Sequence, residues 1–323
     1  MSTLEWYGYG VGARLSPAPE AKDNLEIIAI DEASLQQLGE WPWPRSYLGV
    51  VIKKLNASGA RTIGLALPLH TPQSEFGVRR LDSMRDAYEG KSEKTVKEIL
   101  FLARQRLDTD GALAASLKRS DNTVLAITYG LANDIRRGAH SVSRQTLESY
   151  AFADFPSATD NWKAYLPSVL NTGIPVLTQA QAPIPLLAKY SDAGMLDEAV
   201  SGNRSNLATP LIVKYAEHYY PSFSLMFAAK SLNVDIDDIT INAEQDITMG
   251  GIRLDTDPGY RVYPHIYNNK NGSPAFGIQS FRDIYATDED SQRFHGKDVL
   301  IGITAPSVID QVTIPGGESI APV

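Results

Sequence analysis

The chain has 323 residues, a length that fits either one domain with insertions or two domains. Its 38 acidic and 30 basic residues give a net charge of −8, which argues against nucleic acid or an anionic membrane face as the main partner. It has no cysteine, which excludes disulfides, thiol catalysis and cysteine-based metal sites. No apolar run approaches the ~20 residues of a bilayer span, and no signal-peptide pattern is present. Taken alone, these absences predict a soluble cytoplasmic protein.

Residues 25–69 are predicted to form a strand, a structured turn, a helix and a second strand. The apolar run 25–30 is typical of a buried parallel strand. The Trp-Pro-Trp-Pro run at 41–44 fixes φ at both prolines and places the second one at the start of a helix. Gly59 ends that helix, and residues 62–67 form the next strand. One face of the helix carries the apolar residues, with the spacing of a buried stripe: Leu48, Val51, Ile52 and Leu55.

The middle of the chain continues this alternation. Residues 75–107 carry charges of both signs, which predicts a solvated helical face. Asp110 is expected to cap the helix at 112–118, and residues 124–129 form a third strand. The resulting order of elements predicts an α/β fold with a mainly parallel or mixed central sheet, helices on both faces and an additional helical or loop insertion. Four basic residues then form a stretch that fits either an anion site or a solvated loop: Arg136, Arg137, His140 and Arg144.

The last third of the chain is predicted to be richer in strands. Residues 209–214 begin a strand pair, and Ser222 caps a helix that runs to residue 232. Alternating patterns at 239–241 and 252–254 predict a hairpin-like region. We also expect an edge strand at 260–267 that contains Pro264, a short helix at 281–285 and a buried strand at 297–304.

Three stretches carry a family resemblance: Asp31-Glu32-Ala33-Ser34-Leu35, then Gly39-Glu40-Trp41-Pro42-Trp43-Pro44-Arg45, then Gly59-Ala60-Arg61-Thr62-Ile63-Gly64. They resemble the signature of the CHASE-type extracellular sensor domains of the second class. Such domains are input modules of bacterial adenylate and diguanylate cyclases, histidine kinases and Ser/Thr kinases. Ala66 stands where that family has an acidic residue, and a second family acid falls near Thr71.

The resemblance implies a domain organisation and a location. Residues 1–20 would be a membrane-proximal segment, and residues 21–323 a single sensor domain with insertions at about 72–106 and 130–181. The domain would lie outside the membrane between flanking transmembrane helices of a bacterial inner-membrane protein. A small helix that starts at Pro185 and ends in Gly194 would also match the family.

Templates for catalysis are missing from the sequence. It contains no G-x-S-x-G elbow, no phosphate-binding P-loop, no H-E-x-x-H and no dinucleotide fingerprint after a strand. None of the five histidines is paired with another at metal-ligand spacing: His70, His140, His218, His265 and His295. We therefore predict no catalytic residue, no metal and no cofactor.

One edge of the predicted sheet gathers polar residues. Asp31 and Glu32 close the first strand, Thr304 closes the last, Arg45 opens the main helix and His70 follows the second strand. Because the carboxyl ends of parallel strands share an edge, these residues predict a pocket for a polar ligand. In the alternative, Asp31 caps the next turn and pairs with Arg45 to lock a structural loop, and His70 is an ordinary loop histidine. That loop motif consists of Trp41, Pro42, Trp43 and Pro44.

Three classes of function follow from these patterns. The first is a non-enzymatic sensory input domain that binds an unknown signal and relays a conformational change through its own transmembrane helices to a cytoplasmic output domain. The second is a soluble, hydrolase-like α/β enzyme with its site at the carboxyl edge of the sheet. The third is a structural ectodomain that mediates homodimer formation. Nucleic acid is not an expected partner in any of them.

Overall fold

The computed structural model describes residues 24–73, 101–103, 107–129, 144–153, 155, 173–197, 208–242, 246–263, 276–287, 292–309, 312–313 and 319–320. The predicted membrane-proximal segment 1–20, the basic residues at 136–140 and most of the predicted insertions at 72–106 and 130–181 lie outside these residues.

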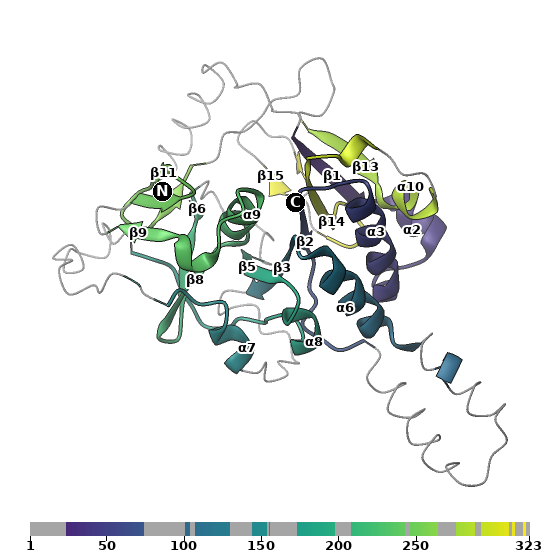
Figure 1. The fold of residues 1–323 in the computed structure, drawn as a ribbon, viewed down its shortest axis with the longest axis horizontal. Helices are drawn as coiled ribbons and strands as arrows, with labels where there is room; N and C mark the ends of the chain where they lie inside the picture. The colour runs from purple at the N-terminus through teal and green to yellow at the C-terminus, as the bar shows by residue number, and fades with distance from the viewer. Residues whose placement is uncertain are drawn as a thin grey trace, which may run out of the picture.

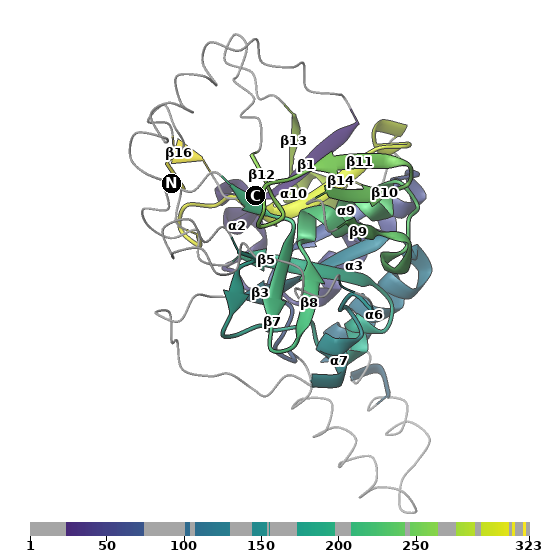
Figure 2. The same cartoon turned by 90° about the vertical axis from the view of Figure 1, so that its left-hand side faces the viewer.

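A six-stranded sheet forms the centre of the molecule, and every pairing within it is parallel (Figures 1 and 2). In spatial order its strands are β13 (Gly277–Ser280), β1 (Leu25–Ile30), β14 (Asp298–Ile303), β2 (Thr62–Ala66), β3 (Thr123–Tyr129) and β5 (Asp192–Asp197). The predicted α/β fold with a parallel sheet is confirmed. β14 lies between β1 and β2, so the two strands of the first predicted unit do not pair directly.

Helices cover both faces of this sheet (Figure 1). One face packs against α2 (Glu32–Leu38), α3 (Arg45–Ala57), α6 (Thr109–Ser120) and α10 (Phe281–Ala286), and the other packs against α9 (Phe223–Ser231). Successive side chains along each strand point alternately to these two faces. Ile63 and Leu65 are fully buried with the α3 side chains, whereas Gly64 between them faces the rings of Phe223 and Phe227 on α9. The predicted apolar stripe of α3 is buried as expected.

Smaller sheets accompany the central sheet, and most of them pack with α9 in a second hydrophobic core (Figure 2). They comprise β4 (Val176–Leu177) with β7 (Ile212–Tyr215) and β8 (His218–Pro221), then β9 (Thr240–Asn242) with β10 (Asp246–Met249) and β11 (Ile252–Asp255), then β6 (Thr209–Pro210) with β12 (Arg261–Val262), and β15 (Val312–Thr313) with β16 (Ser319–Ile320). Short helical pieces complete the description: α7 (Arg144–Glu148), α8 (Pro185–Ala188), η4 (Ile236–Asp238) and η6 (Gln292–Phe294).

Four sequence-based expectations need correction. The strands predicted at 239–241 and 252–254 do not pair with each other, because β10 lies between them. The strand predicted at 260–267 is described only as the two residues of β12, and 264–267 lie outside the described residues. Asp110 does not cap α6, since the Asp108 side chain accepts the N–H of Gly111 at 2.8 Å.

The fourth correction concerns Gly194. The helix α8 ends at Ala188, and Gly194 lies inside β5, a strand that the sequence patterns did not indicate. The backbone at the start of α9 approaches this glycine closely. A Cβ built on Gly194 would lie 2.5 Å from the Ser222 carbonyl oxygen and 2.7 Å from the Phe223 Cα. Glycine at this position therefore allows α9 to dock against the edge of the sheet.

This contact generates a prediction on stability. Gly194→Ala should lower the free energy of unfolding by about 3 kcal/mol, because backbone atoms cannot move aside as a side chain can. Gly64→Ala is the matched control. The nearest atoms there are the ring carbons of Phe227 at 2.9 Å, which can shift, so its cost should be about 1 kcal/mol. Urea unfolding of both variants measures the difference, and equal costs would contradict this account of the docking.

Candidate functional site

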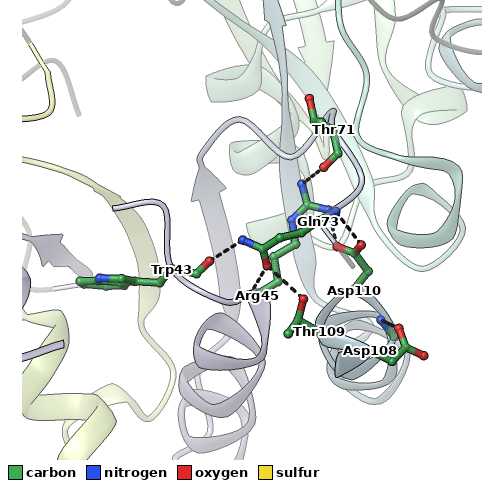
Figure 3. Close-up of polar contacts among 8 residues, drawn as sticks. Trp43, Arg45, Thr71, Gln73, Asp108, Thr109 and Asp110 are labelled. Atoms are coloured by element: carbon green, nitrogen blue, oxygen red, sulfur yellow. Dashed lines mark hydrogen bonds and ion pairs between the residues drawn. The ribbon is translucent and has the colours of Figure 1, made fainter. Parts of the chain in front are cut away.

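A buried ion pair lies at the carboxyl edge of the sheet. The Arg45 Nη1 is 2.5 Å from the Asp110 Oδ1, and the two side chains are only 7% and 6% exposed (Figure 3). Arg45 is the first residue of α3, and its Nη2 also donates to the Thr71 carbonyl oxygen at 2.7 Å. Burial lowers the pKa of the Arg45 guanidinium below its ordinary value, while the Asp110 carboxylate opposes that shift. Arginine nevertheless stays protonated in proteins, so this is a buried pair of charges.

Gln73 completes the group around this ion pair. Its side-chain oxygen accepts the backbone N–H of Arg45 at 2.8 Å and the Thr109 hydroxyl at 3.0 Å. Its own backbone N–H donates to the Asp110 Oδ2 at 2.8 Å. We name Arg45, Thr71, Gln73, Thr109 and Asp110 the Arg45 clamp. The clamp joins the chain after β2 to the beginning of α6 and to the beginning of α3.

The clamp also explains how α3 begins. Pro44 occupies the N-cap position, and α3 has no side-chain cap from that residue. Proline has no side-chain oxygen that could accept the first helical N–H groups. Gln73 supplies this acceptor from another loop, and its side-chain nitrogen donates to the Trp43 carbonyl oxygen at 2.8 Å. The loop at 41–44 and the chain after β2 therefore hold each other in place.

The Trp-Pro-Trp-Pro loop packs into the core through Trp43. This side chain is 3% exposed, and its ring centroid lies 5.0 Å from that of Phe281 and 5.4 Å from that of Trp41. The Trp43 indole N–H donates to the Gly39 carbonyl oxygen at 2.7 Å, and Trp41 is partly buried. The peptide bond between Trp41 and Pro42 is cis.

A second polar group lies at the ends of β1 and β13. The Asp31 Oδ1 accepts the backbone N–H of Ser34 at 2.8 Å, the Ser34 hydroxyl at 2.6 Å and the Ser280 hydroxyl at 2.9 Å. We name Asp31, Ser34 and Ser280 the Asp31 group. Burial by itself raises the pKa of Asp31, but the hydrogen bonds from Ser34 and Ser280 outweigh it and hold the pKa below its ordinary value. Next to this group, the Glu32 Oε1 accepts the N–H of Ser307 at 2.9 Å.

Comparison with models of protein families identifies the family to which this chain belongs. The sequence model of the CHASE2 domain matches residues 1–323, the whole chain. The chain belongs to the CHASE2 family. No match was found among curated proteins or among solved structures. CHASE2 domains are extracellular sensory domains of membrane proteins and not catalytic domains, which supports a sensory input role.

The structure places the predicted ligand residues of this CHASE2 domain in two neighbourhoods. Asp31, Glu32 and Thr304 follow the ends of β1 and β14, where the Thr304 N–H donates to the Ile30 carbonyl oxygen at 3.0 Å. Arg45 belongs to the clamp, and the half-buried His70 lies on the chain between β2 and the clamp. A single pocket that unites all five residues stays a prediction.

The alternative prediction for Asp31 and Arg45 is half right. Asp31 does cap the next element, as the N-cap of α2. It does not pair with Arg45, which pairs with Asp110 instead, and no hydrogen bond or ion pair between described residues joins Asp31 to Arg45. Local patterns could identify neither Gln73 nor the pairing of Asp110 with Arg45, because the tertiary fold fixes these partners.

Two further observations concern the described parts of this CHASE2 domain. Within them, no helix combines the length and the apolar character needed to cross a bilayer. Their histidines, aspartates and glutamates nowhere gather in a group of three or more that could hold a metal ion.

The clamp generates a second prediction. Arg45→Met should lower the free energy of unfolding by about 3–5 kcal/mol, because it leaves the Asp110 charge buried without its cation. Lys230 offers a control, since its Nζ lies 2.8 Å from the Asp192 carboxylate, whose side chain is 41% exposed and so stays solvated without the cation. Lys230→Met should cost only about 1 kcal/mol. Urea unfolding tests both, and similar costs would show that burial does not set the strength of the clamp.

The Asp31 group generates a third prediction, on pH. A lowered folded-state pKa means that the Asp31 charge stabilises the fold above its ordinary value of 3.8, and that this stabilisation is lost as the pH falls through the folded-state pKa. The stability difference between the wild type and Asp31→Asn should therefore shrink as the pH is lowered from about 6 to about 3. Urea midpoints across this range measure it. A difference that does not change with pH would argue against an ionised Asp31 in the fold.

Proposed function

We propose that this chain is the extracytoplasmic sensory input domain of a bacterial inner-membrane protein. It binds a signal outside the cytoplasm and passes a conformational change through flanking transmembrane helices to a cytoplasmic output domain of the cyclase or kinase type. The observation that carries the proposal is the match of the CHASE2 family to the whole chain. The domain itself performs no chemistry in this proposal, and a homodimer is a candidate form of the intact receptor.

The carboxyl edge of the sheet is the proposed place for the signal molecule. In open α/β sheets, ligands bind outside the carboxyl ends of the strands. Asp31, Glu32 and Thr304 stand at the ends of β1 and β14, with Arg45 at the start of α3 and His70 on the connection after β2. Ionised Asp31 can only accept hydrogen bonds, so we propose a polar signal that donates hydrogen bonds, such as an amine or a polyol.

Signal transmission requires that the domain have two states with different affinity for this molecule. The clamp and the Asp31 group fit that requirement, because hydrogen-bonded and packed contacts switch between discrete arrangements and do not deform gradually. A signal that binds at the Asp31 group would compete with, or add to, the hydrogen bonds from Ser34 and Ser280. The bound state would then differ in how α2 and α10 meet.

The hydrolase alternative gains no support from the serine beside Asp31. A nucleophile must reach the substrate with a base next to it. Ser34 is fully buried, and its described partners are Asp31, Ser280 and the backbone N–H of Arg282. Its position explains how α2 starts better than it explains a reaction.

A ligand screen on the purified domain tests the proposal. Polyamines, amino acids, sugars and nucleosides are scanned for a rise in melting temperature, which a ligand causes by binding only the folded state. We expect a hit whose effect is lost in Asp31→Asn and kept in Asp121→Asn. Asp121 is the matched control because it is exposed and lies in the left-handed conformation that asparagine tolerates.

The same experiment extends to the intact gene product in membrane vesicles. The hit should change the output activity when it is added to the extracytoplasmic side and not when it is added to the cytoplasmic side. Effects from the cytoplasmic side, or turnover of a compound by the isolated domain, would overturn the proposal. A receptor whose output ignores every compound, and whose domain none of them stabilises, would favour the structural ectodomain.

A further inference from the structure

We propose that one continuous mechanical link runs along the carboxyl edge of the sheet, from the Arg45 clamp to Ser307 in the chain that follows β14. It passes through Trp43, α10 and the Asp31 group. This inference rests on the proposed sensory function, because the link is the path by which a change at the clamp would reach the C-terminal side of the domain.

The first step joins the clamp to the Trp-Pro-Trp-Pro loop. Gln73 holds the Trp43 carbonyl oxygen and the Arg45 N–H at the same time, each at 2.8 Å. Its backbone is tied to Asp110 on α6. A displacement of the chain at 71–73 relative to α6 therefore must either move Trp43 or break these hydrogen bonds. Gln73 itself is exposed, so an external event can reach it.

The second step joins α3 to α10. Trp43 packs on Phe281, the fully buried first residue of α10, and the Tyr47 ring lies 4.8 Å from that of Tyr285. At the other end of α10, the Lys54 ammonium donates to the carbonyl oxygens of Tyr285 at 2.7 Å and Thr287 at 2.5 Å. A cation at a helix C-terminus is favourable because it meets the negative end of the helix dipole. Contacts with the α3 side of the molecule thus hold α10 at both of its ends.

The third step joins α10 to the exit of β14. Ser280, directly before α10, donates its hydroxyl proton to the Asp31 Oδ1, and the Arg282 N–H donates to the Ser34 oxygen. Asp31 caps α2, whose first residue, Glu32, accepts the Ser307 N–H at 2.9 Å. A shift of α10 is therefore passed to α2 and from there to the chain after β14.

The amino edge of the sheet has ion pairs of its own. Glu26 is held by Arg293 at 3.2 Å and Lys297 at 3.0 Å. Asp298 is held by Arg61 and by the Ser231 hydroxyl. These contacts fix the starts of β1 and β14, at the edge of the sheet opposite the clamp.

The test is hydrogen exchange of the Ser307 amide, followed by NMR on the purified domain. Gln73→Ala should speed this exchange about fivefold, the change expected for losing one net hydrogen bond of stabilisation from the link. Gln37→Ala is the matched control. Gln37 is exposed on α2 itself, close to the readout, and its side chain makes no hydrogen bond within the part of the chain that the structure describes. The Leu211 amide, bonded to the Tyr260 carbonyl oxygen at 2.9 Å beside α9, reports any global loss of stability.

A second variant tests the route. Glu32→Ala removes the acceptor of the Ser307 N–H, so the Ser307 amide should exchange fast and should no longer respond to Gln73→Ala. The proposal is overturned if Gln73→Ala leaves Ser307 unchanged, if it speeds Ser307 and Leu211 equally, or if it still acts on Ser307 in the Glu32→Ala background. This test needs no signal. If the exchange results confirm the link but the output of the intact protein never responds, only the sensory function is refuted. If the output responds but the exchange results show no link, only this inference is refuted.

Discussion

The fold at the carboxyl edge depends on how the Arg45 and Asp110 charges are compensated inside the protein. Removing two charges from water costs several kcal/mol per ion, and only good geometry with further hydrogen bonds repays it. The Thr71 carbonyl oxygen and the Gln73 N–H supply those bonds. With these bonds in place, the pair sets the starts of α3 and α6 relative to the end of β2.

Strand alternation gives the sheet two cores of different character. Side chains such as Ile63 and Leu65 face α3 and α6, where long aliphatic residues interdigitate. The opposite face carries small residues, including Gly64 and Ala126, and so α9 with its phenylalanines can lie close to the strands. Residues of β7 to β10 then join α9 in the second hydrophobic core.

The sequence was informative where a residue's neighbours along the chain determine its structure. The apolar runs of β1, β2 and β14, the stripe of α3 and the cap of α2 by Asp31 follow from local rules. β5 was missed because Asp-Ala-Gly-Met-Leu-Asp has few β-branched residues, and only the tertiary contact with α9 explains its glycine. The prediction that Asp110 caps a helix at 112–118 rests on the preference for aspartate just before a helix, but α6 begins earlier, at Thr109. The partner of Asp110, Arg45, is fixed by the tertiary fold, and no local pattern identifies it.

The parallel pairing of β1 with β14 determines how the domain would bear a mechanical load. The two strands are aligned from Leu25 with Asp298 to Ile30 with Ile303. The chain thus enters β1 at one edge of the sheet and leaves β14 at the opposite edge, about 20 Å away for strands of this length. Tension between the entering and the leaving segments would act along the strands, in shear. All the hydrogen bonds between β1 and β14 would share that load at once, whereas a hairpin pulled at its open end loses its bonds one after another.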